Sequence, residues 1–149
     1  MPQLNIGDIT LTGKGALQGR IAFHAHGGPE QNTSGSAFKI QYTTALTNVG
    51  GHYSTSNHRF TAPVTGIYYF QYRHMQTSAT TYDRSQFKMS GTYVGDQAFD
   101  DGGQYAHTNN SIIISMNANQ YMEVWTDVNS NGQGSVWGDI RAFQGFLLG

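Results

Sequence analysis

Residues 49–72 read V-G-G-H-Y-S-T-S-N-H-R-F-T-A-P-V-T-G-I-Y-Y-F-Q-Y and combine two turns with two strands. Two glycines open the stretch, and glycine adopts the positive φ angles of tight turns at little steric cost. Arg59–Thr61 is predicted to be extended, and the A-P-V-T-G of residues 62–66 to turn, because proline fixes φ at the start of a turn. Residues 67–72 carry large side chains on both faces, which predicts a strand that is covered on both sides.

Two segments near the ends of the chain complete this pattern. Residues 22–25 read A-F-H-A, and residues 142–148 read A-F-Q-G-F-L-L. With the central stretch they resemble the globular heads of the complement C1q and tumour-necrosis-factor-like family, in which a G-x-Y/F…F-x-A-P-x-x-G-x-Y-x-F signature marks the middle of the domain. The resemblance implies an all-β fold, a ten-stranded antiparallel jelly-roll sandwich that assembles as a homotrimer. It covers residues 19–149 as one C1q-like domain and leaves residues 1–18 as an amino-terminal arm.

The composition favours the same fold class without the resemblance. Charged residues make up only 11% of the 149 residues, and 19 are glycines. Clusters of Gly, Asn, Asp and Pro recur along the chain, as expected for short strands joined by tight turns. No stretch shows a sustained helical period with caps at both ends. The sequence therefore predicts an all-β protein.

Further strands follow from the alternation of apolar and polar residues. Residues 85–90 and 92–97 are predicted to pair around Gly91, and residues 111–116 and 121–127 to form a hairpin. Ile113 is predicted to point away from the core. Aromatic residues of the opening, central and closing segments are predicted to form the core, namely Phe23, Phe60, Tyr68, Phe70, Phe143 and Phe146.

Several classes of function are disfavoured by the sequence. The net charge is −1 and the eight basic residues are scattered, whereas nucleic-acid binding needs clustered Lys and Arg. No apolar run approaches the roughly 20 residues of a membrane span. Cysteine is absent, and no spacing matches a dinucleotide loop or a nucleophile elbow. We therefore predict a non-enzymatic protein without a cofactor.

Two patterns are metal-site candidates. His24 and His26 share a face of a strand, so both imidazoles could reach one metal, but we interpret them as ordinary strand histidines. Residues 127–132 match the first half of a calcium loop, with Asp127, Asn129 and Asn131 as weak candidate ligands. Position twelve of that loop is Gly138 instead of a bidentate glutamate. No metal site is predicted for this sequence.

Calcium-binding relatives take their ligands from acidic residues before a strand that reads like S-I-I-I. This chain has Asp96, Asp100 and Asp101 in that region, but Ala106 and His107 occupy the positions near which a further aspartate would be expected. The resemblance therefore does not carry calcium over to this chain.

The resemblance implies a trimeric surface module, and two settings for it remain open. The first is a bacteriophage virion surface, as a capsid decoration (cement) protein or fibre knob, with a major capsid or fibre protein and a host surface glycan as partners. It is favoured because the chain shows no signal peptide, no collagen-like stalk and no cysteine. The alternative is a secreted, extracellular C1q-like pattern-recognition lectin or ligand.

The arm carries apolar residues at a density unusual for a solvated tail, and these are Leu4, Ile6, Ile9 and Leu11. We predict that it attaches the head to another surface. The alternative is that it adds an edge strand to its own or a neighbouring subunit.

Overall fold

The structure, a computed structural model, describes residues 21–33, 36–76, 82–100, 105–129, 134–136 and 140–149. The regular secondary structure of these residues is all β, and none of their segments forms a helix that is long and apolar enough to cross a membrane. The strands are Ala22–His26 (β1), Gln31–Thr33 (β2), Phe38–Lys39 (β3), Thr44–Val49 (β4), Tyr53–Ser54 (β5), Arg59–Thr61 (β6), Gly66–Met75 (β7), Tyr82–Met89 (β8), Thr92–Asp100 (β9), His107–Met116 (β10), Tyr121–Asn129 (β11), Gly134–Val136 (β12) and Ala142–Leu147 (β13).

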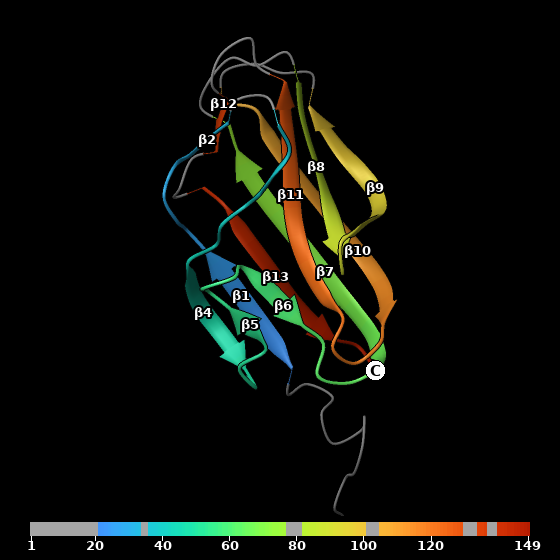
Figure 1. Ribbon diagram of the computed structural model, residues 1–149. Coiled ribbons are helices and arrows are strands. Elements are labelled where there is room, and N and C mark those ends of the chain that lie inside the picture. The colour runs from blue at the N-terminus through green and yellow to red at the C-terminus, as the bar shows by residue number, and fades with distance from the viewer. Residues whose placement is uncertain (1–20, 34–35, 77–81, 101–104, 130–133, 137–139) are drawn as a thin grey trace, which may run out of the picture.

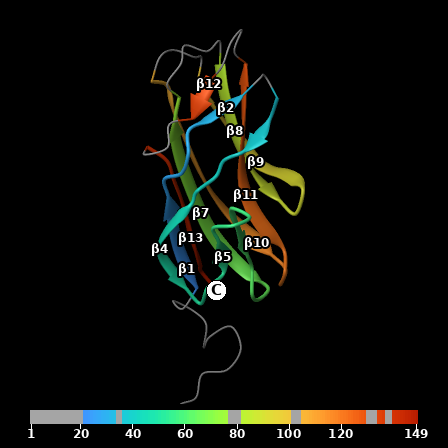
Figure 2. The same cartoon turned by 60° about the vertical axis from the view of Figure 1, so that its left-hand side comes forward.

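Two antiparallel sheets pack face to face as an elongated sandwich (Figures 1 and 2). The first sheet has the strand order β10-β7-β13-β1-β4, and the second follows the order β5-β6-β11-β8-β9. Together these two paths give the ten strands of the predicted jelly roll. The remaining short strands are additions, because β3 pairs with β11, and β2 and β12 form a small sheet of their own.

The pairing of β10 and β11 differs from the prediction of a hairpin. Residues 117–120 do connect the two strands, but β10 pairs with β7 in the first sheet, while β11 pairs with β6 and β8 in the second. The connection therefore crosses from one sheet to the other. A short polar loop between two strands looks the same in a sequence whether the chain turns back within one sheet or changes sheet. The predicted pair around Gly91 is present as β8 and β9.

Aromatic side chains fill the space between the sheets. Phe23 on β1 stacks on Tyr53 and Phe60 of the second sheet, with ring centroids 5.0 and 5.1 Å apart. It also meets Phe143 of β13 edge-on at 4.8 Å. Tyr68 and Phe70 join the same cluster from β7. Such pairs add to the stability that comes from burial of the rings, so this cluster is the main apolar core.

The sequence predicts Phe146 in the core, and this prediction is wrong for the single chain. Its side chain is 43% exposed, whereas Phe143 on the same strand is completely buried. Successive side chains of a strand point to opposite faces, so residues three apart cannot share one. β13 directs Phe143 and Leu147 inward, and Gly145 lies between them because a Cβ at that position would lie 2.4 Å from the Phe70 ring. Phe146 consequently points outward.

Two predicted features lie outside the described residues. These are the amino-terminal arm with Leu4, Ile6, Ile9 and Leu11, and the calcium-loop candidate Asn131. The other loop candidates, Asp127 and Asn129, belong to β11, and their backbones pair with β8. The positions of their side chains are likewise outside the described structure.

Candidate functional site: the open face of the first sheet

The first sheet has one face on the core and one face on solvent, which we call the open face. Its side chains alternate along β1, β7, β10 and β13 with those of the core. In cross-strand register they form rows, because directly opposed residues of antiparallel strands point to the same side. The open-face residues of these strands and of the segment after β13 are Ala22, His24, His26, Ile67, Tyr69, Gln71, Arg73, His107, Asn109, Ser111, Ile113, Ser115, Ala142, Gln144, Phe146 and Leu148.

One half of the open face is apolar. Tyr69 on β7 lies opposite Ile113 on β10 and opposite Phe146 on β13, and the Tyr69 and Phe146 rings are 5.3 Å apart. Ile113 is 66% exposed, Ile67 is 48% exposed, and Leu148 is also exposed. Ile113 points away from the core, as the sequence predicts. Large apolar side chains gathered on one solvent-facing patch mark a surface that another molecule covers.

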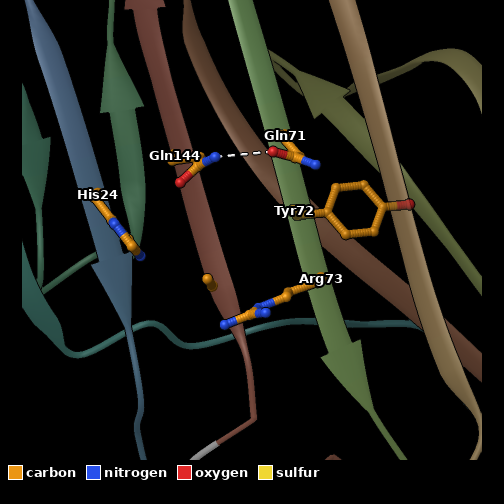
Figure 3. A pocket seen from close by; sticks show the side chains of 6 residues that line it. His24, Gln71, Tyr72, Arg73 and Gln144 are labelled. Carbon is orange, nitrogen blue, oxygen red and sulfur yellow. Dashed lines mark hydrogen bonds between the residues drawn. The ribbon is translucent and has the colours of Figure 1, made fainter.

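The other half of the open face is polar and hollowed. Gln71 lies opposite Gln144, and the Gln144 Nε2 amide donates a hydrogen bond of 2.8 Å to Gln71 Oε1. One step along the strands, Arg73 lies opposite Ala142. Figure 3 shows His24 and Arg73 extending toward each other across β13, below this amide pair. Because Ala142 contributes only a methyl group there, a hollow of about 270 Å³ remains.

The hollow is electropositive. The Arg73 guanidinium makes no hydrogen bond or ion pair with any described residue, and none of the open-face residues is a carboxylate. Burial lowers the pKa of the His24 imidazole, and the charges of His26 and Arg73 lower it further. The His24 and His26 rings lie 6.4 Å apart on the same face, as the H-x-H spacing predicts. No group of three metal-binding side chains occurs among the described residues.

A second polar cluster lies inside the sandwich. His74 Nε2 is 2.9 Å from Asp83 Oδ2, and Thr108 Oγ1 is 3.2 Å from the same His74 nitrogen. Thr108 and Thr126 also donate hydrogen bonds to the Asp83 carboxylate, and all four side chains are buried. A catalytic triad needs the nucleophile and the carboxylate on different ring nitrogens, with the nucleophile open to substrate. Here the Asp83 carboxylate and the Thr108 hydroxyl meet the same His74 nitrogen, and the cluster is closed to solvent. Its role is therefore structural.

Sequence reasoning identified His24 and His26 but missed Gln71, Arg73 and Gln144. These three residues belong to strands that are far apart in the chain and become neighbours only through the register of β7 with β13. A faint signal exists in β7. Its outward-facing positions change from the apolar Ile67 and Tyr69 to the polar Gln71 and Arg73. That signal marks a polar half-strand without showing what lies beside it.

We expect no tight calcium site in this protein. The loop of residues 127–138 lacks the closing carboxylate that completes the shell of a hard cation. Calorimetric titration of the metal-free protein with calcium is therefore expected to give no binding stronger than millimolar. Submicromolar binding that disappears in Asp127→Ala would contradict this and make the loop a metal site.

Comparison with known proteins agrees with this architecture. The C1q domain model matches residues 22–148. A complement C1q subcomponent of Rattus norvegicus is 31% identical over 115 residues, which cover 73% of this chain and 43% of that protein. The corresponding subcomponent of Mus musculus is 27% identical over 110 residues, with the same coverage of both proteins. The chain thus spans less than half the length of the curated relatives that it matches.

Solved structures of low sequence identity share the fold. The globular domain of zebrafish complement 1qA superposes with a TM-score of 0.63 at 15% identity, covering 87% of this chain and 98% of that chain. Murine APRIL superposes with a TM-score of 0.65 at 10% identity, covering 85% and 98%. These likenesses show a common jelly roll. Together with the family match over nearly all of the described sandwich, they confirm the resemblance of the three sequence segments: the chain belongs to the C1q domain family.

Proposed function

We propose that this protein is a non-enzymatic recognition module that works as a homotrimer, with the open face as its subunit interface. The observation that carries the proposal is the apolar half of that face, where Ile67, Ile113 and Phe146 are all more than 40% exposed in the single chain. Trimerisation is what the family resemblance implies, and a trimer would cover these side chains. Subunit interfaces bury an apolar centre of this kind behind a polar rim.

The outward face of the second sheet also exposes Tyr93 and Phe99, but it is richer in charged groups. Its Glu123 carboxylate forms ion pairs with Lys39 and Arg59, whose Nζ and Nη2 atoms lie 3.1 and 2.9 Å from Glu123 Oε1. The Lys88 ammonium lies 3.9 Å from the centre of the Trp125 ring. The Lys39 and Arg59 side chains already have Glu123 as a partner and remain partly exposed, which suits a solvated surface. This contrast supports association through the first sheet and leaves the second sheet facing solvent.

We assign recognition to the outer surface of such a trimer. A secreted, extracellular setting fits the relatives best, because these are complement C1q proteins. Three identical heads bind a repetitive target more durably than one. The virion setting, with a capsid or fibre protein as partner and the arm of residues 1–18 as attachment, is the second candidate. It is favoured by the absence of cysteine from the whole sequence.

The trimer is tested by measuring its mass. Light scattering on the protein at micromolar concentration should return about three times the 16.3 kDa mass of one chain. A monomer at this concentration would contradict the proposal. A glycan array probed with the same trimer then tests glycan recognition, which both settings allow.

The assembly should depend on Ile113 and not on an equally exposed residue of the other sheet. Ile113→Asp is expected to abolish trimers at micromolar concentration while leaving the fold intact, because it places an unpaired charge in the apolar half of the interface. Phe99→Asp is the matched control, since Phe99 is 63% exposed on β9 of the second sheet. Far-ultraviolet circular dichroism and light scattering measure fold and mass. Equal loss of the trimer in both variants would contradict the choice of face.

A further inference from the structure

We propose that the hollow above β13 binds a small tetrahedral oxyanion of the sulfate or phosphate class, held by Arg73 with His24 opposite. Nothing in the family resemblance assigns a ligand to this place. The inference goes beyond the proposed function and rests on it only for the enclosure of the site between subunits. Each chain forms the hollow from its own residues, which come from β1, β7 and β13 (Figure 3).

The charge of the hollow selects an anion. Arg73 presents a planar set of donors that fits the oxygens of sulfate or phosphate, and no described residue occupies those donors. His24 extends toward the guanidinium from the opposite side. The same positive charge opposes a metal ion on the His24 and His26 pair, because a cation there would be repelled by Arg73. The electrostatics therefore favour an anion over a metal ion, a choice that the two histidines alone would not decide.

The size of the hollow selects a small ion. Its volume of about 270 Å³ lies below the range of roughly 300–1,000 Å³ that is typical for drug-sized ligands. Its walls are polar, with the hydrogen-bonded amides of Gln71 and Gln144 on one side. The floor is the Ala142 methyl group, which lies opposite Arg73 in the register. A compact ion that takes several hydrogen bonds fits these walls better than an apolar or extended molecule.

Assembly adds a reason for the anion. When the open face is covered, Arg73 and its two copies lose water, and an unpaired charge that loses its hydration is strongly unfavourable. None of the open-face residues that the structure describes is a carboxylate that could compensate this charge. An oxyanion in each hollow would neutralise the guanidinium and let the polar half of the face be buried together with the apolar half. Bound anion and trimer should therefore stabilise each other.

The test is calorimetric titration of the purified trimer with sodium sulfate at constant ionic strength, with chloride as the compensating ion. Wild-type protein is expected to bind one sulfate per chain. Arg73→Gln should weaken this binding by roughly tenfold or more, because it removes the charge-assisted bonds. Arg84→Gln, which makes the same change on β8 of the second sheet, should bind sulfate like the wild type.

Thermal melting gives a second readout. Sulfate at ten times its Kd should raise the Tm of the wild type by about 3–5 °C more than that of Arg73→Gln. The comparison between variants removes the general stabilising effect of sulfate on proteins, which acts on both. A sulfated tetrasaccharide should not compete with free sulfate, because the trimer encloses the site. Competition by the tetrasaccharide would overturn the assignment to a free ion.

Binding should also tighten as the pH falls from about 8 to about 5.5, since sulfate keeps its charge while His24 gains a proton beside it. The charged and titratable groups of the open face around His24 are His26 on β1, Arg73 on β7 and, beyond Arg73, His107 on β10. The adjacent strands β13 and β4 place the neutral Gln144 and Thr47 opposite His24. Heats that do not differ between wild type and Arg73→Gln would overturn the site. Light scattering on the same samples reports the trimer separately, so a monomer that binds sulfate through Arg73 would overturn the proposed assembly and leave the site standing.

Discussion

Replacing Phe143 with alanine is expected to lower the free energy of unfolding by about 3–5 kcal/mol, as truncation of a buried aromatic ring generally does. Phe143 is completely buried at the centre of the aromatic core, where its ring meets Phe23, Tyr42 and Phe70 at centroid distances of 4.8, 5.6 and 6.0 Å. The ring also meets Tyr53 and Phe87 of the second sheet, so the substitution removes contacts with both sheets and leaves a cavity between them. Chemical denaturation followed by intrinsic fluorescence measures the loss.

Phe146→Ala is the matched comparison, because it makes the same change three residues later on the opposite face of β13. We expect it to leave the unfolding free energy of the isolated chain nearly unchanged and to weaken the trimer instead. Phe143→Ala should therefore change the result of the stability assay, and Phe146→Ala the result of the association assay. Equal destabilisation of the monomer by both would contradict the orientation of β13.

Loss of the Asp83 carboxylate is expected to be about as damaging. Asp83→Ala leaves the His74 ring and the Thr108 hydroxyl buried without their acceptor, and breaking a buried polar pair in this way costs about 3–5 kcal/mol. Thr126 keeps the Arg84 carbonyl as an acceptor, at 3.0 Å. Denaturant midpoints at neutral pH measure this cost. Asp96→Asn, an exposed site on β9, is the control and should change stability by less than about 0.5 kcal/mol.

The same carboxylate predicts how stability depends on pH. Burial raises the pKa of Asp83, but the hydrogen bond and charge of His74, helped by the two threonines, outweigh burial, so its pKa lies below the ordinary value of 3.8. A lowered pKa in the folded state means that the contribution of Asp83 is fully present above about pH 4 and is lost as the pH falls through the folded pKa. Asp83→Asn should therefore flatten the acid limb of the stability profile. An unchanged acid limb would contradict this role of Asp83.

The local structure of this protein was predictable because it depends on neighbouring residues. The positions of β6 and β7, the turns that flank them and the opening and closing strands follow from glycine, proline and the period of two. Gly50 and Gly51 adopt the positive φ angles, 83° and 72°, that their turn requires. The family also follows from sequence alone, since three short segments in the right order suffice to indicate it.

The tertiary structure decided which side of each strand meets the core and which strands become neighbours. β7 and β13 carry large residues on both faces, so a period of two cannot distinguish Phe143, which is inside, from Phe146, which is outside. The separation of β10 from β11, the pairing of His74 with Asp83, and the hollow between His24 and Arg73 depend on contacts between distant parts of the chain. Such contacts are set by how two whole sheets pack, and no stretch of sequence contains that information by itself.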